Sequence, residues 1–217
     1  MVEEILSYDE MCHKENTGLQ KGINFNLGDR HSIILMSRAP DATYHDEFKE
    51  NNTVLIYEGH NAPQTGGVDP KTIDQPERTP SGTLTQNGKF HEAAQQFKIG
   101  DRTAERVKVY ENMQKGKWIY HGIFLLTDSW IQNDETRNVF KFKLNATDDT
   151  QFTVKELNKI KQRVMIPSSI MTEVLEKYDC KCTECGSENN LAFIHTGTDP
   201  ITSDNVKIVC EKHNSKK

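Results

Sequence analysis

The chain has 217 residues, of which 35% are hydrophobic and 27% charged, and its formal net charge is −5. This length suffices for one domain of about 150 residues with a buried core and a small second domain. The charge divides into −6 for residues 1–150 and +1 for residues 151–217. This balance excludes a non-specific nucleic-acid binder, so any contact with DNA must come from a local basic surface or from a pocket that recognises one base.

Residues 1–20 are polar and acidic, and no stretch of the chain resembles a signal peptide or a membrane span. We therefore expect a cytoplasmic protein that makes no contact with a membrane. Four of the five cysteines fall within the last 40 residues. This clustering favours metal binding over a disulfide framework.

Two apolar runs, SIILM at residues 32–36 and TVLIY at residues 53–57, predict buried strands. Residues 61–89 form a long segment rich in glycine and proline, and such loops are usually functional or disordered. We favour a functional loop, because it runs into a helix. One face of that helix carries an apolar stripe with core-facing spacing, made of Phe90, Ala93, Ala94 and Phe97.

Three later runs, at residues 106–110, 118–127 and 139–144, predict antiparallel strands, two of them with clean polar and apolar alternation. Strands dominate this part of the chain and the connections are turn-like. We expect an α+β protein whose first domain, residues 1–150, is a curved, barrel-like sheet with one or two helices.

These elements, in this order, resemble the SRA (YDG) domain, a reader that flips a modified cytosine out of double-stranded DNA. The resemblance covers roughly residues 8–146, and Tyr120-His121-Gly122 stands in the place of the Tyr-Asp-Gly triplet. It implies a partner duplex that carries 5-methyl- or 5-hydroxymethylcytosine. The segments that carry the resemblance are SIILMS, TVLIYEGH, Asp74-Gln75, LTQNG, RVKVYE and WIYHGIF.

A flipped base must be stacked between flat side chains and hydrogen-bonded along its edge, because unstacking costs a few kcal/mol. By the resemblance, Tyr44 and Tyr57 would be the two aromatic walls. Asp46, or alternatively Glu47, would accept a hydrogen bond from the cytosine amino group. The pocket would be completed by the residues after the second aromatic, Glu58 and Gly59. The alternative is a half-buried strand residue for Tyr57 and a solvated loop charge for Asp46.

The long loop, by the same resemblance, would approach the DNA grooves. Gln86 and Asn87 carry amides, which pair well with base edges, and they would face the base left without its partner. Solvated turn residues are the alternative interpretation.

A connecting helix is predicted after residue 150. Thr153 and Glu156 form a capping box, and residues 154–163 are the most basic stretch of the chain. We take residues 151–166 as a basic helical linker. A helix capped by Ser168 or Ser169 would then lead into a small C-terminal domain, residues 167–217.

Four residues of this last segment have the spacing of a zinc site. Cys182 and Cys185 form one C-x-x-C pair, and Cys210 and His213 form a second pair of the same spacing. Zinc takes four such sulfur and nitrogen donors in a tetrahedron, so we expect a structural Zn²⁺ that staples a fold too small to bury its own core. A helical spacing from Val206 to His213 predicts that the second pair lies on a helix. Unrelated thiols are the alternative.

Between and after these pairs the order His195, Asn205, Asn214 resembles the HNH nucleases, whose ββα fold holds one divalent ion. The resemblance implies that His195 is the general base, that Asn205 holds the loop, and that Asn214 binds a catalytic Mg²⁺ or Mn²⁺. The sequence departs from the family at Ile194, where a metal-binding carboxylate is usual, and in its short loop. A strand-end histidine satisfied by a loop carbonyl is the alternative for His195.

Together the two resemblances favour a modification-dependent DNA endonuclease of the bacterial restriction type, with a reader before an HNH module. Ile194 keeps a second hypothesis open, a non-catalytic modified-DNA reader with a degenerate HNH domain, and a zinc-stapled protein-interaction module is a third. One HNH site per chain would favour a homodimer if both strands are cut.

Overall fold

The computed structural model describes residues 3–19, 22–27, 31–39, 42–64, 66–114, 116–147, 164–197 and 200–214. The linker helix predicted for residues 154–163 lies outside these ranges. No helix within them is both long and apolar enough to cross a lipid bilayer.

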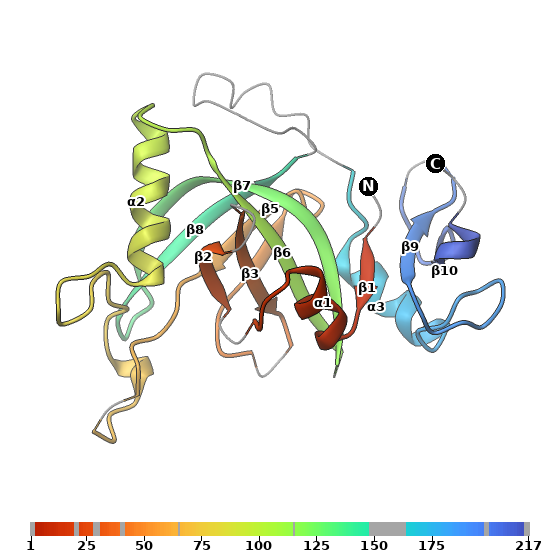
Figure 1. The fold of residues 1–217 in the computed structure, drawn as a ribbon, viewed down its shortest axis with the longest axis horizontal. Coiled ribbons are helices and arrows are strands. Elements are labelled where there is room, and N and C mark those ends of the chain that lie inside the picture. The colour runs from red at the N-terminus through yellow and green to blue at the C-terminus, as the bar shows by residue number, and fades with distance from the viewer. Residues whose placement is uncertain are drawn as a thin grey trace.

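The fold is α+β and is built around one long strand. Strand β7 (Lys117–Asn133) pairs with β1 (Glu4–Leu6) and β6 (Glu105–Gln114) along its first half and with β8 (Asn138–Ala146) along its second. These pairings are antiparallel, which confirms the prediction for the three later runs. Figure 1 shows β6 and β7 arching through the middle of the molecule.

The remaining strands extend the sheet on both sides. Strands β2 (Ile23–Leu27) and β3 (His31–Ser37) follow β6, with β3 parallel to β6. Strands β5 (Val54–Glu58) and β4 (Glu47–Lys49) follow β8. Among the described strands no pairing joins β2 to β4, so the expected curved, barrel-like sheet is open between these two strands.

Helix α2 (Gln86–Lys98) packs on this sheet and buries its apolar face in the core. The Thr85 hydroxyl accepts from the Gly88 N–H and caps the first turn. The predicted apolar stripe is confirmed, because Phe90, Ala93, Ala94 and Phe97 are all buried. The helix begins four residues before Phe90, so Gln86 and Asn87 belong to its first turn and not to the preceding loop.

The C-terminal part joins the same sheet through β1. One edge of β1 pairs with β7 and the other with β9 (Leu191–His195), which in turn pairs with β10 (Val206–Cys210). Strands from the two predicted domains are therefore neighbours in one continuous sheet (Figure 1). Helices α1 (Tyr8–Lys14) and α3 (Ser168–Lys177) flank this junction.

Two local predictions for this part were wrong. Residues 206–213 are not a helix but β10 followed by a single 3-10 turn, η3 (Glu211–His213). The β-branched residues of VKIVC favour a strand that β9 pairs along its whole length. The side chains of Ser168 and Ser169 do not cap α3, because Pro167 occupies the N-cap position.

A buried polar cluster crosses the junction. His121, which stands in the place of the family's aspartate, lies with its Nε2 2.8 Å from Glu111 Oε2. Arg38 donates to the other oxygen of Glu111 at 2.7 Å, and the Ser168 hydroxyl donates to Oε2 at 3.1 Å. Burial raises the pKa of Glu111, but His121 and Arg38 outweigh it and hold the pKa below its usual value. This ionised carboxylate thus ties α3 to the sheet.

Candidate functional site

A cavity of about 470 Å³ opens beside β3 and the loop that follows it. Its walls include Tyr44 and Asp46, two residues expected to touch a base, together with Leu35, Ser37 and Trp118. The structure thus brings one predicted aromatic wall and the predicted hydrogen-bonding carboxyl group into one space large enough for a nucleobase.

Asp46 is held from β5. Its Oδ1 accepts a hydrogen bond from the backbone N–H of Glu58 at 2.9 Å. Burial raises the pKa of Asp46 to about 7, and the negative charge of Glu58 adds to the rise, while the Glu58 N–H and Lys141 oppose it. At neutral pH the carboxyl group is therefore present both as acid and as carboxylate.

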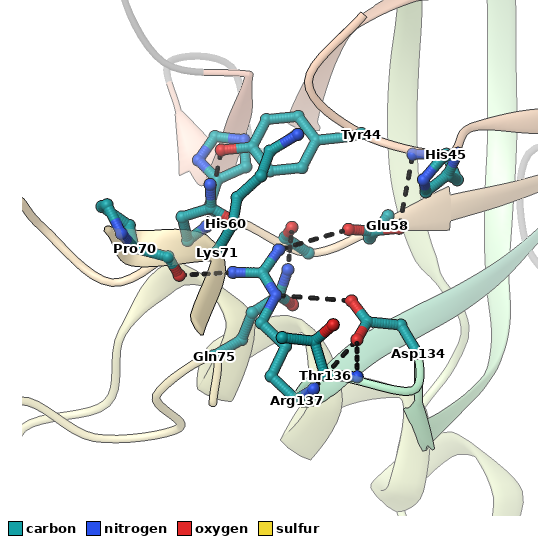
Figure 2. A network of polar contacts seen from close by, with 12 residues as sticks. Tyr44, His45, Glu58, His60, Pro70, Lys71, Gln75, Asp134, Thr136 and Arg137 are labelled. Carbon is teal, nitrogen blue, oxygen red and sulfur yellow. Dashed lines mark hydrogen bonds and ion pairs between the residues drawn. The ribbon is translucent and has the colours of Figure 1, made fainter. Parts of the chain in front are cut away.

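The ring that stacks on Tyr44 belongs to His60 and not to Tyr57. The two ring centroids are 5.3 Å apart with an angle of 9° between the planes, and the pair is visible in Figure 2. Tyr57 is only 1% exposed and packs in the core, with its hydroxyl 3.1 Å from His60 Nε2. Its expected role as the second wall stays a prediction. Reasoning from the sequence missed His60, although a flat ring directly after TVLIYEG was a usable signal.

Asn87 and Gln86 are engaged within the chain. Asn87 accepts from the His60 N–H at 2.9 Å and donates to the His60 carbonyl at 2.8 Å, so it clamps the backbone on both sides of the stacked ring. Gln86 accepts from the Phe25 N–H at 2.8 Å. Their predicted contact with a base is untested by this geometry.

Glycine is the one residue type that fits at position 59, between β5 and α2. Gln75 donates to its carbonyl at 2.6 Å, and a Cβ at this position would lie 2.6 Å from Gln75 Oε1 and 2.8 Å from Asn87 Oδ1. The glycine therefore permits the close approach that fixes His60.

Glu58 lies at the centre of a buried charge network (Figure 2). Lys141 donates to Glu58 Oε2 at 2.8 Å, and Arg137 lies 3.7 Å from Oε1. Arg137 also donates to the Pro70 carbonyl at 2.6 Å and lies 3.5 Å from Asp134. Neither Glu58 nor Arg137 lines the cavity. The side chain of Glu58 anchors the loop before α2, while its backbone holds Asp46.

The four predicted metal ligands converge. One donor atom from each of Cys182, Cys185, Cys210 and His213 lies within 4.8 Å of all the others. Cys185 Sγ is 3.8 Å from Cys210 Sγ, and His213 Nδ1 is 3.5 Å from Cys182 Sγ and 3.4 Å from Cys210 Sγ. A tetrahedron with Zn–S of about 2.3 Å and Zn–N of about 2.0 Å requires separations of about 3.8 and about 3.5 Å. The cluster therefore fits a metal ion such as zinc.

The Cys182 thiol has a lowered pKa, which favours metal binding. Burial raises the pKa of this group, but hydrogen bonds from the backbone N–H groups of Cys210, Glu184 and Cys185, together with His213, outweigh it and leave the pKa at about 6. A thiolate is the form that binds metal.

A second cavity, of about 500 Å³, lies beside this cluster at the ends of β9 and β10. It is lined by His195 and Asn214, with Glu3, Glu184 and Ile194 nearby in the same wall. His195 Nε2 is buried and has no hydrogen-bond partner among the described residues. Carboxylate and amide oxygens are the donors that hard divalent cations prefer, so this cavity has a donor set that fits such an ion.

Asn205 does not line the cavity but holds the loop beside it. It accepts from the Thr202 N–H at 2.8 Å, donates to the Pro200 carbonyl at 3.0 Å, and its own carbonyl accepts from the Thr196 N–H at 2.7 Å. Since Thr196 directly follows His195, this pattern restrains the end of β9.

No family model matches the chain, and no curated protein matches it. Solved structures are similar in part. The SUVH5 SRA complex with hemimethylated CG DNA is 26% identical, with 60% of this chain and 76% of that chain covered and a TM-score of 0.40. The SUVH5 SRA domain bound to fully hydroxymethylated CG DNA is 22% identical over 70% and 92%, with a TM-score of 0.43. KRYPTONITE in complex with mCHH DNA, an H3 peptide and SAH is 16% identical over 69% and 32%, with a TM-score of 0.42. These TM-scores lie below 0.5, so the likeness alone carries no conclusion about this chain.

The Glu58 network predicts a strong stability effect. Glu58→Gln should lower the free energy of unfolding by about 3–5 kcal/mol, because Arg137 and Lys141 would lose the carboxylate that compensates their buried charge. Urea denaturation followed by circular dichroism measures this loss. Glu77→Gln, at an exposed position, is the matched control. Equal stability of the two variants would contradict the network's importance.

The cysteine and histidine cluster predicts one zinc per chain. Cys185→Ser should release the metal and lower the melting temperature, because a structural zinc site contributes directly to folding. Metal content by mass spectrometry and thermal melting together test this, with Cys12→Ser, outside the cluster, as control. A wild-type protein purified without zinc and unaffected by its addition would refute the prediction.

Proposed function

We propose that this chain reads a modified cytosine flipped out of a DNA duplex and cleaves the DNA with a metal-dependent site at His195. The observation that carries the reader is the shared cavity of Tyr44 and Asp46 beside β3. The sequence resemblance to SRA domains supports the same assignment, and the cavity at His195 and Asn214 supports the nuclease.

The cavity supplies what a flipped base needs. Tyr44 offers a flat wall, held in place by the stacked ring of His60 and by the Asn61 N–H, which donates to its hydroxyl at 3.4 Å. Asp46 offers a hydrogen-bonding group for the base edge. Glu47, the alternative, is less suited, because its carboxylate is exposed and lies 3.2 Å from Lys49. A modified cytosine would therefore stack on Tyr44 and meet Asp46 with its Watson–Crick edge.

Protonated Asp46 complements cytosine better than the carboxylate does. The cytosine edge presents an amino donor beside the N3 acceptor, and a carboxylic acid offers an acceptor beside a donor. The carboxylate would bind the amino group but would repel the N3 lone pair. The raised pKa of Asp46 thus favours the acid form, which complements the cytosine edge.

The C-terminal cavity would perform hydrolysis. A neutral His195 imidazole would take a proton from the attacking water, as a general base does. Asn205 restrains the loop that follows this histidine. Asn214 and a cavity carboxylate would hold Mg²⁺ or Mn²⁺, which supplies electrostatic stabilisation of the phosphate charge. The zinc in the cysteine and histidine cluster would be structural only.

Ile194 favours a second candidate function, a reader without nuclease activity. This apolar side chain lines the cavity where the resemblance places a carboxylate. Loss of an anionic ligand weakens the binding of hard cations. On this alternative the protein binds modified DNA and leaves it intact.

If this chain reads a modified cytosine, its affinity for DNA should depend on pH through the pKa of Asp46. Affinity for a duplex with one modified cytosine should fall by about tenfold between pH 6 and pH 8, because the acid form is lost as pH rises through about 7. Asp46→Asn, which keeps a donor beside an acceptor, should remove this dependence, and Asp46→Leu should bind weakly at both values. Fluorescence anisotropy measures all three. An affinity that rises with pH would contradict binding of the base by protonated Asp46.

The nuclease predicts that His195→Ala abolishes cutting and leaves binding intact, because the histidine activates water and does not touch the base. One gel with Mn²⁺ and matched duplexes, with unmodified, methylated or hydroxymethylated cytosine, scores retardation and fragments together. Fragments from a modified duplex with wild-type protein alone support the proposal. Retardation without fragments for both proteins would favour the non-catalytic reader, and equal cutting by both would remove His195 from the mechanism.

A further inference from the structure

Strand β1 places a carboxylate beside the candidate catalytic histidine. The β1–β9 register pairs Glu4 with Ala192 and Ile5 with Leu191, and the Phe193 N–H donates to the Glu3 carbonyl at 3.0 Å. Glu3 therefore lies opposite Phe193. Because side chains alternate along a strand, Phe193 and the residue two positions on, His195, share one face with Glu3.

This alternation puts Glu3 and His195 in a diagonal cross-strand relation. Such neighbours have Cα atoms about 7–8 Å apart, with shorter distances between side chains. Ile194, between Phe193 and His195, lies on the other face of the strand, and it too lines the cavity at the end of β9. The carboxylate that the sequence lacks next to the histidine is thus present across the sheet, on a residue almost 200 positions earlier in the chain.

Glu3 and His195 also line one cavity with Asn214. Glu3 is only 5% exposed, and its Oε1 accepts from the Ile166 N–H at 3.3 Å, which fixes one oxygen of the carboxylate. His195 Nε2 is buried in this region and has no partner among the described residues. A fixed carboxylate, an amide and a histidine ring therefore line one cavity.

The other carboxylate in the wall is a weaker candidate. Glu184 is 49% exposed at its side chain and lies 3.3 Å from Lys207, which also lines the cavity. Solvent competes with a metal ion for the exposed oxygens of Glu184. Glu3 is buried and so is held in one position, as a metal ligand needs to be.

We propose that Glu3 is the carboxylate ligand of the catalytic divalent cation, in place of the residue that is Ile194 in this chain. Asn214 provides a second oxygen ligand, and His195 lies beside the ion as the base. This inference rests on the proposed nuclease function and gives it the anionic ligand that hard cations require. It also makes the N-terminal strand part of the C-terminal site.

Mn²⁺ binding tests this directly, without any DNA cutting. Zinc-loaded full-length protein is titrated with Mn²⁺, and the free ion is followed by its electron paramagnetic resonance signal. Glu3→Gln should weaken Mn²⁺ binding at least tenfold. Glu4→Gln should leave it unchanged, because Glu4 does not line the cavity and pairs with Lys14 at 2.5 Å. Zinc content and circular dichroism should match the wild type in both variants.

A second variant covers the case in which Glu3→Gln disturbs the fold. Adding Ile194→Asp to Glu3→Gln returns a carboxylate to the cavity from the other position and should restore Mn²⁺ binding. Loss of binding in the single variant with recovery in the double variant supports a ligand role. Loss in both, with altered circular dichroism, overturns it in favour of a structural role for Glu3.

The remaining outcomes separate this inference from the proposed function. Equal Mn²⁺ affinity of wild type and Glu3→Gln overturns the ligand role, and if the wild type also cuts modified DNA, the nuclease proposal survives alone. Loss of binding in Glu184→Gln but not in Glu3→Gln assigns the ligand to Glu184 and overturns the inference. A wild type that neither binds Mn²⁺ nor cuts DNA overturns both.

Discussion

Backbone hydrogen bonds along both edges of β1 hold this protein together. The three residues of this strand join β7, in the large sheet, to β9, in the metal-binding hairpin. A two-stranded hairpin alone is at best marginally stable in water. Pairing with β1 extends the β9–β10 hairpin to three strands, and the cysteine and histidine cluster closes its far end. The connection between the large sheet and the C-terminal hairpin therefore depends on one short segment near the start of the described chain.

Buried carboxylates give the structure its second set of fixed points. Glu58 and Glu111 are both almost fully buried, and each is compensated by nearby cationic groups, Lys141 and Arg137 for the first, Arg38 for the second. Such networks restrict the geometries that a fold can adopt, because breaking one leaves an uncompensated charge. The Glu58 network holds the loop before α2 and, through the backbone, Asp46. The Glu111 cluster attaches α3 to the sheet.

The two cavities differ in the environment of the polar groups that line them. In the cavity of Tyr44 and Asp46, burial raises the pKa of Asp46 to about 7, and the acid form would suit a base that presents both a donor and an acceptor. In the C-terminal cavity, the buried carboxylate Glu3 lines the same space as His195, whose Nε2 has no partner among the described residues, and such groups would suit a cation and a water molecule. Separate regions of one continuous sheet thus carry the two cavities for which we propose recognition and hydrolysis.

The sequence by itself determined the elements whose signal is local. The C-x-x-C spacing of Cys182 and Cys185 predicted the metal cluster, and the apolar stripe of α2 predicted its core face. The alternation in β6 and β8 predicted that both are strands, and each pairs with β7. Tertiary structure alone decided features that depend on partners distant in sequence. Residues 206–213 had helical spacing, yet β9 offered an edge that made them a strand. His60 stacks on Tyr44 because Asn87 of α2 holds its backbone, and Glu3 lies opposite Phe193 because β1 pairs with both β7 and β9. Spacing along a chain records neighbours in sequence, whereas hydrogen bonding across a sheet is set by whichever strand edge is available.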